Sequence, residues 1–207
     1  KKNFPKQNWD YHEHRNSNIE NYKLAINEAI NKGYYVFRMG QDVSEKLLIN
    51  DSKFIDYSNK YRTDFLDVFL AYKCKFCITS GTGWDSLPSF VFRKPTIFSN
   101  FVPVGAMTTY SKKFMFSIKI HYDRVKNKKM NLKEISESPV AYTYSSKIFE
   151  ASKIDLIENT PEELKDLTIE MIDKLENNFF ISDKELENQN KFWSKYTEYF
   201  KLEKIKS

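Results

Sequence analysis

The stretch Cys77-Ile-Thr-Ser-Gly-Thr-Gly-Trp-Asp-Ser-Leu-Pro-Ser-Phe90 decides the predicted fold. The apolar run from Phe76 to Ile78 predicts a short buried strand, and the small residues after it predict a turn. A helix is expected from Trp84 to Phe92, and a second strand from Thr96 to Ser99. Because strand, glycine turn, helix and strand follow one another, the sequence predicts an α/β fold.

The glycine turn is the predicted binding site for an anion. A helix N-terminus presents unpaired N–H groups and the positive end of the helix dipole, and both favour negative charge. Gly81 and Gly83 lack a Cβ, so a phosphate could approach the backbone closely. An ordinary strand-to-helix turn capped by Thr82 or Asp85 explains the same residues, so this stretch alone leaves both interpretations open. The candidate ligand-binding residues of the turn are Ser80, Gly81, Thr82, Gly83, Trp84 and Asp85.

Length and composition fit one ordinary domain, or a large half of a two-domain protein, with a real hydrophobic core. The chain has 207 residues, of which 41% are hydrophobic and 16% aromatic. The net charge is +5, and basic residues alternate with acidic ones, which argues against a nucleic-acid-binding protein. No apolar run approaches the ~18 residues of a membrane span, and no signal peptide is visible. A cytoplasmic protein is therefore expected, with association at the inner face of a membrane as one option.

The two cysteines, Cys74 and Cys77, form a C-x-x-C pair at the entry to the predicted strand. Two thiolates cannot complete a tetrahedral zinc site, and a redox motif would open a helix instead. Both are expected to be reduced core thiols. The segment His12-Glu-His14 offers few further ligands, so no metal site and no cofactor are predicted.

The segments before the turn predict further alternation of helix and strand. Ser17-Asn-Ile-Glu20 is a capping box that opens a helix ending at Gly33. Strands are expected at Tyr34–Arg38 and Phe54–Asp56. Thr63 caps a helix that reaches about Tyr72, with a predicted apolar face of Phe65, Leu66, Phe69 and Leu70. This alternation predicts a parallel sheet with right-handed crossovers.

The segments after the second strand predict several capped helices. Asn131 opens a short helix, and capping boxes begin at Thr160 and Ser182. Pro161 at the first helical position supports the helix start after Thr160. We expect the helices from Pro161 onward to pack back across the sheet.

Five pieces of the sequence together resemble a bacterial family of glycosyltransferases that is described largely from sequence. The resemblance implies a GT-B-like, Rossmann-like domain that holds the donor, a nucleotide-diphosphate sugar, and it implies a glycan or other glycoconjugate as acceptor. It also implies that residues 1–16 are an entry segment left from a missing N-terminal part, and that 17–207 form the nucleotide-sugar-binding domain. The five pieces are Arg15-Asn-Ser-Asn-Ile-Glu-Asn-Tyr22, Gly33-Tyr-Tyr-Val-Phe-Arg-Met-Gly40, Asp67-Val-Phe-Leu70, Ser80-Gly-Thr-Gly83 and Ile157-Glu-Asn-Thr-Pro-Glu-Glu163.

The resemblance also suggests roles for residues outside the turn. GT-B enzymes generally stabilise the departing diphosphate with helix dipoles and basic side chains rather than a metal, and Arg15 and Arg38 are the candidates for this role. Local candidates for a catalytic base are His14, with His12 and Glu13 beside it. The candidates for binding the base or ribose are Gln41, Asp42 and Tyr57.

Two other classes of function remain open. Sugar-nucleotide epimerases share this architecture but need carboxylates beside the sugar, and the turn supplies Asp85 alone. A non-catalytic module that merely holds a nucleotide or a partner is the third option. The sequence does not predict an oligomeric state.

Overall fold

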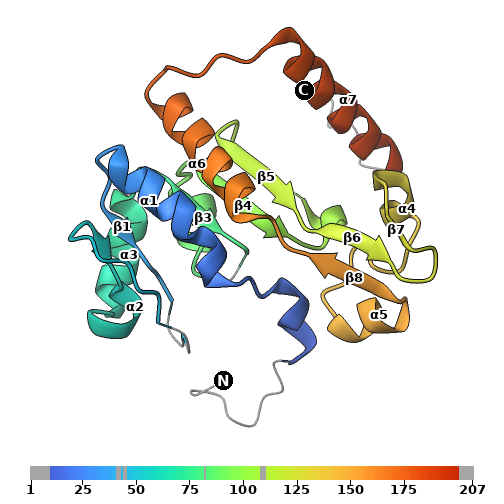
Figure 1. Ribbon diagram of the computed structural model, residues 1–207, viewed down its shortest axis with the longest axis horizontal. Coiled ribbons are helices and arrows are strands. Elements are labelled where there is room, and N and C mark those ends of the chain that lie inside the picture. The colour runs from blue at the N-terminus through green and yellow to red at the C-terminus, as the bar shows by residue number, and fades with distance from the viewer. Residues whose placement is uncertain (1–9, 41–42, 44–45, 82, 108–110, 201–207) are drawn as a thin grey trace.

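The molecule has an α/β fold in which short parallel strands are flanked by helices (Figure 1). A computed structural model describes residues 10–40, 43, 46–81, 83–107 and 111–200. Their strands form a two-stranded parallel sheet, a three-stranded parallel sheet and a three-stranded antiparallel sheet. The predicted α/β class with parallel pairing is confirmed, although the described strands make separate small sheets.

The parallel strands occupy the N-terminal half of the chain. β1 (Val36–Phe37) pairs with β2 (Phe54–Ile55). β3 (Cys77–Thr79), β4 (Thr96–Phe101) and β5 (Phe114–Ile118) pair in that order. Burial explains the central position of β4, since its first five residues are all buried.

The two parallel sheets adjoin at the start of β1 and β3. The ring of Tyr34, just before β1, lies 5.7 Å from the ring of Phe76, just before β3. Figure 1 shows β1, β3, β4 and β5 in this order across the molecule. Open α/β sheets bind ligands outside the carboxyl ends of the strands.

Helices on both sides cover these strands. α1 (Lys23–Asn31) follows the short 3₁₀ helices η1 (Asp10–Arg15) and η2 (Ile19–Tyr22), and it packs against α6 (Pro161–Leu175). Figure 1 shows α1 and α6 together across one face of the β3–β4 region. The remaining helices beside the parallel strands are α2 (Tyr57–Lys60), α3 (Asp64–Lys73) and the π-helix η3 (Leu87–Val91), of which α3 and η3 contact each other.

The antiparallel sheet, which the sequence did not predict, continues from the end of β5 (Figure 1). β6 (Ile120–Asp123) pairs with β7 (Lys128–Lys129) on one side and with β8 (Ile154–Ile157) on the other. Two short helices lie beside it, α4 (Leu132–Ser136) and α5 (Ser146–Ala151).

The C-terminal helices confirm half of the packing prediction. α6 returns over the sheet and contacts β4, as expected. α7 (Asp183–Tyr199) instead packs on α4, beside the 3₁₀ helix η4 (Val104–Ala106). The hydroxyl of Tyr196 fixes α7 there, because it donates a hydrogen bond of 2.9 Å to the carbonyl oxygen of Val104. Burial of this hydroxyl raises the pKa of Tyr196 to about 12.

Several local predictions are wrong, each for a physical reason. The helix after the glycine turn is only the five-residue η3, because Pro88 lacks the N–H that a regular helix would use there. Asn18 caps η2 in place of the predicted Ser17. The predicted apolar face of α3 is partly exposed: Phe65 is 75% and Phe69 42% exposed, while Ala71 is buried.

Among the residues that the structure describes, no helix has the length and apolar character that a membrane span requires.

Candidate functional site

A cavity of about 230 Å³ opens at the carboxyl ends of β3 and β4. It lies beside the glycine turn that the sequence singled out. Its lining combines one cation and one carboxyl with a largely aromatic wall. The lining residues are Arg15, Gly81, Gly83, Asp85, Ser86, Phe90, Phe98, Phe101, Val102, Ala106, Phe116 and Tyr144.

The turn itself does not present free amides as predicted. Gly81 and Gly83 take positive φ angles of 81° and 102°, which L-residues rarely adopt. The amide of Gly81 donates to Thr79 Oγ1 at 3.0 Å, and the amide of Gly83 donates to Asp85 Oδ1 at 2.5 Å. Since η3 begins only at Leu87, no long helix dipole points at the turn. The amides of Gly81 and Gly83 are therefore engaged within the turn, unlike in the expected phosphate cradle.

Arg15 supplies the positive charge at the turn instead. A Cβ placed on Gly81 would lie 3.4 Å from Arg15 Nη2, so the guanidinium lies directly beside this glycine. On its other side, Arg15 Cζ lies 5.8 Å from the ring centre of Tyr144. The structure thus brings Arg15 to the predicted site, from a segment 66 residues before Gly81 in the sequence.

Asp85 is the acidic partner in the cavity. It is buried, with 5% of its surface exposed. Burial raises the pKa of Asp85 above its ordinary value, against the opposing effects of the Gly83 amide and the Arg15 charge. The carboxyl is therefore protonated more readily than an ordinary aspartic acid.

A buried ion pair holds the segment that carries Arg15. Lys119 Nζ donates to the carbonyl oxygen of Asn16 at 2.5 Å and lies 3.6 Å from Glu158 Oε1. Glu158 Oε2 accepts from the amide of Asn18 at 2.9 Å and from the side chain of Asn21 at 3.1 Å. Burial lowers the pKa of Lys119, and the nearby Glu158 charge opposes this effect. The segment around Arg15 is thus positioned by residues more than a hundred positions away.

A second polar group links the same segment to the end of β4. The hydroxyl of Tyr22 lies 2.9 Å from Ser99 Oγ and accepts from Asn100 Nδ2 at 3.3 Å. Asn100 is fully buried and exchanges hydrogen bonds with Asn159, just before α6. The sequence analysis did not select Asn100, Asn159, Lys119 or Glu158. Two features of the sequence could have pointed to the asparagines. Asn100 directly follows the predicted strand Thr96–Ser99, and Asn159 directly precedes the helix cap Thr160.

His14 lies apart from the cavity lining. His14 is buried and its ring stacks on Phe149 at 5.0 Å. Its Nδ1 lies 3.0 Å from Ser146 Oγ, so η1 is fastened to α5. Glu13 is exposed, and the side chain of His12 lies outside the described part of the structure. The described end of the predicted entry segment therefore packs into the fold and is not separate from it.

Arg38 and Tyr57 are inside the fold and do not line the cavity. Only 9% of the Arg38 side chain is exposed, and its Nη1 lies 3.9 Å from Asp56 Oδ2. Tyr57 is 2% exposed, and its hydroxyl lies 3.0 Å from the carbonyl oxygen of Thr63 and 2.9 Å from Asp67 Oδ1. The ring of Tyr57 therefore offers no open face on which a base could stack, which corrects that expectation.

The other predicted residues divide into two groups. Ser80 is buried next to the turn, and Trp84 is half-buried, with no hydrogen-bond partner for its Nε1 among the described residues. Gln41, Asp42 and Thr82 lie outside the described residues.

The described residues contain no group of three His, Cys, Asp or Glu side chains placed to hold a metal ion. Both cysteine thiols are free, and burial raises the pKa of each. No protein-family model, no curated protein and no solved structure matches this chain.

Proposed function

We propose that this chain binds the donor of a GT-B-type glycosyltransferase, a nucleotide-diphosphate sugar, in the cavity at the ends of β3 and β4. The observation that carries the proposal is the guanidinium of Arg15 beside the open turn at Gly81. A fixed cation at the carboxyl ends of parallel strands is suited to a phosphate group. The resemblance to bacterial glycosyltransferases supports the same substrate class.

The cavity lining has a charged part and an apolar part, and each suits a different part of the ligand. Arg15 takes the diphosphate, and the aromatic wall that includes Phe101 and Tyr144 takes an uncharged face of the base or sugar. Asp85 lies in the same lining, where a carboxylate would repel a diphosphate. Because its pKa is raised, Asp85 carries its charge less readily, and the repulsion is smaller.

Sugar transfer requires the bond between the anomeric carbon and the diphosphate oxygen to break. The electron pair leaves with the nucleoside diphosphate, so negative charge grows on that oxygen. A cation held in place before the reaction stabilises this charge without reorganising. The Lys119–Glu158 pair fixes the backbone at Asn16 and Asn18, next to Arg15, and we propose that this positions the cation.

The residues that bind the acceptor are not assigned to this cavity. His14 packs between Ser146 and Phe149, so we do not place a catalytic base there. In GT-B enzymes the base usually belongs to the other half, and we propose the same division here, with a glycan or other glycoconjugate as acceptor.

A sugar-nucleotide epimerase is the second candidate, and Asp85 favours it. A buried carboxyl with a raised pKa that lines a cavity is the kind of group that can take and return a proton. A non-catalytic nucleotide-binding module would use the same cavity without turnover.

One experiment separates the three functions. Uridine, guanosine, adenosine and thymidine diphosphates are first tested for a rise in melting temperature, because a ligand of the native state must stabilise it. The sugar nucleotide of the best base is then incubated with and without a glycan acceptor. Transfer that depends on the acceptor supports the glycosyltransferase, an epimerised nucleotide sugar supports the epimerase, and binding without turnover supports the module. If no nucleotide raises the melting temperature, the proposal is wrong.

A further inference from the structure

Six basic residues gather at the opposite edge of the parallel sheet from the cavity. Each lies in the few residues before a strand: two before β3, two before β4 and two before β5. Because these strands are parallel, their starts share one edge. We call this set the basic edge; its members are Lys73, Lys75, Arg93, Lys94, Lys112 and Lys113.

The charge of the basic edge is not neutralised within the fold. Among the described residues, no ion pair joins any of its six cations to a carboxylate. The segments 73–75, 93–94 and 112–113 contain no acidic residue. By contrast, two cations of the β6–β7 region are paired, Lys126 with Asp123 and Lys128 with Glu134.

Exposed apolar side chains adjoin the basic edge. Tyr72 is 53% exposed at the end of α3, and Val91 is 62% exposed at the end of η3. The ammonium groups of Lys73 and Lys94 lie 5.4 and 5.3 Å from the ring centre of Tyr72. The ring of Tyr72 also contacts Phe92 at 5.5 Å.

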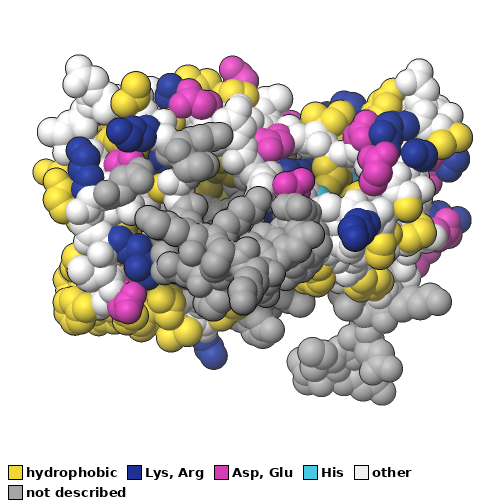
Figure 2. Space-filling model, turned by 90° about the horizontal axis from the view of Figure 1, so that it is seen from below, with side chains coloured by type: hydrophobic (Ala, Val, Ile, Leu, Met, Phe, Trp, Pro, Cys, Tyr) yellow, Lys and Arg dark blue, Asp and Glu magenta, His cyan; other side chains and the backbone are white. Residues whose placement is uncertain are grey.

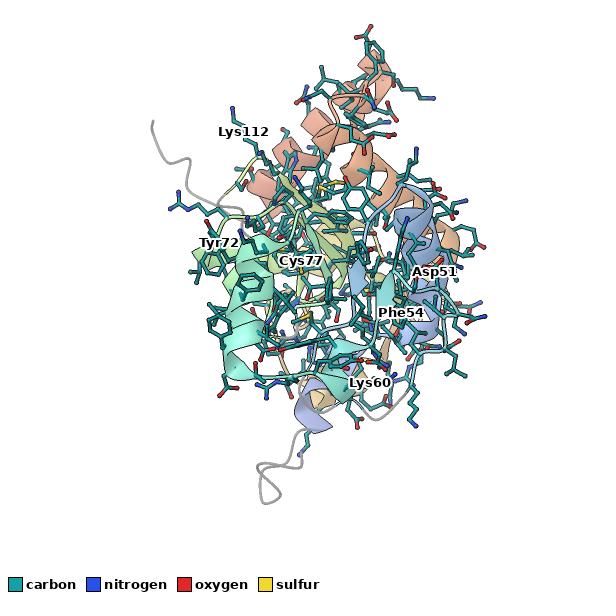
Figure 3. All side chains as sticks on the ribbon, turned by 90° about the vertical axis from the view of Figure 1, so that its left-hand side faces the viewer. Asp51, Phe54, Lys60, Tyr72, Cys77 and Lys112 are labelled. Carbon is teal, nitrogen blue, oxygen red and sulfur yellow. The ribbon has the colours of Figure 1, made fainter. Side chains whose placement is uncertain are left out.

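Figure 3 labels two residues of this region. Lys112 and Tyr72 lie toward one side of the molecule there, away from Lys60 at the end of α2. Figure 2 shows apolar side chains gathered at the lower left of the face that is seen from below.

We propose that the basic edge, with Tyr72 and Val91, docks this protein on an anionic lipid bilayer. Cations that surround exposed aromatic and aliphatic groups match the two layers of such a surface. The ammonium groups meet the negative headgroups, and the apolar tips enter the boundary with the acyl chains. Lysines suit this position because their stems lie along apolar surface while their charges remain in the headgroup layer.

This docking leaves the candidate cavity accessible. The cavity opens at the carboxyl ends of β3 and β4, and the basic edge lies at their amino ends. The proposal does not depend on the function proposed for the cavity, since it uses different residues and a different ligand.

Vesicle sedimentation tests the proposal on the whole chain. The probes are vesicles of phosphatidylcholine alone and vesicles that also contain phosphatidylglycerol. Binding is expected to the anionic vesicles only, and it should fall as salt is raised. Equal binding to both kinds of vesicle, or binding to neither, would overturn the proposal.

Matched variants locate the surface. Each cation near a charged surface contributes about fivefold to binding, so Lys75→Gln with Lys113→Gln should weaken binding by about 25-fold. The control double variant is Lys184→Gln with Lys191→Gln, on exposed positions of α7, and it should bind like the unmodified chain. If the control variant loses as much binding, the basic edge is not the surface that binds the anionic vesicles.

The apolar contribution has its own pair of variants. Val91→Ser should weaken vesicle binding several-fold, whereas Val125→Ser, a valine 77% exposed in the β6–β7 turn, should not. Unchanged melting temperatures show that all variants fold. The third probe is a single-stranded RNA. If the chain binds this RNA but not vesicles, and the lysine double variant loses that binding, the edge would be assigned to nucleic acid instead.

Discussion

Asn100 and Asn159 exchange two hydrogen bonds between side chain and backbone, although 59 positions separate them. The amide of Asn100 donates to Asn159 Oδ1 at 2.7 Å, and the amide of Asn159 donates to Asn100 Oδ1 at 2.6 Å. This pair joins the end of β4 to the start of α6. Through Asn100 Nδ2 and Tyr22 it also reaches the segment that carries Arg15. The same buried hydrogen bonds therefore join β4 to α6 and join both to the segment that carries Arg15.

Asn100→Ala should lower the free energy of unfolding by about 2–4 kcal/mol. The change leaves the buried amide of Asn159 without its acceptor, which costs about 1–3 kcal/mol. It also places alanine at a φ of 52°, which costs roughly 1 kcal/mol more. Asn177→Ala is the control, because Asn177 has a similar φ of 60° but is exposed. Urea unfolding measures both, and equal losses would show that the exchange adds nothing beyond backbone strain.

Gly81→Ala and Gly83→Ala should have similar effects on stability and different effects on ligand binding. Both glycines have positive φ, so each alanine is strained. A Cβ on Gly81 approaches Arg15 Nη2 at 3.4 Å, whereas a Cβ on Gly83 meets nothing within 4 Å. Calorimetric titration with the stabilising nucleoside diphosphate should therefore show several-fold weaker binding for Gly81→Ala alone. A larger loss of affinity for Gly83→Ala would contradict this and would indicate that the diphosphate binds on the Gly83 side of the turn.

Glu158→Gln should loosen the segment that holds Arg15. The change removes the negative charge beside buried Lys119 and weakens the bond to the Asn18 amide, at a cost of about 1–3 kcal/mol in unfolding free energy. Nucleoside diphosphate binding should weaken as well, although Glu158 does not line the cavity. Glu150→Gln is the control, since it removes an exposed partner of Arg124 and should alter neither quantity measurably. Full affinity in Glu158→Gln would show that Arg15 is held by other contacts.

His121 should make the fold less stable as the pH falls below neutrality. It is 1% exposed, and burial lowers its pKa from 6.5 to about 4. Between these two values the unfolded chain binds more protons, so the free energy of unfolding rises with pH across this window, by about 3 kcal/mol at most. Urea unfolding from pH 4 to pH 7 should show a flatter profile for His121→Gln. Parallel profiles for the two proteins would rule out this role for His121.

Local signals in the sequence predicted the helix starts well. The capping boxes at Asn131, Thr160 and Ser182 are all present, and Thr63 accepts from the amide of Leu66 as expected. Each cap involves groups within three residues, so the pattern contains all the partners. The parallel pairing around the glycine turn followed from the alternation of elements.

Long-range contacts account for what the sequence could not predict. Glu158, 140 positions away, accepts from the amide of Asn18. The turn was recognised, but its amides proved to be engaged by Thr79 and Asp85. The sequence pattern around a turn does not show whether a nearby side chain will accept the hydrogen bond of an amide that a ligand could otherwise use. Arg15 does lie beside the turn at Gly81, whereas the buried environment of Tyr57 was not foreseen.

The central claim is that Arg15 holds the diphosphate of a nucleotide sugar above the turn at Gly81. Calorimetric titration of Arg15→Gln tests it most directly, with the sugar nucleotide and the matching free nucleoside as ligands. Loss of a charge-assisted contact should weaken the sugar nucleotide at least tenfold and leave the nucleoside unchanged. Arg124→Gln, at an exposed surface ion pair, should bind both ligands normally. Unchanged affinity for the sugar nucleotide in folded Arg15→Gln would contradict the assignment.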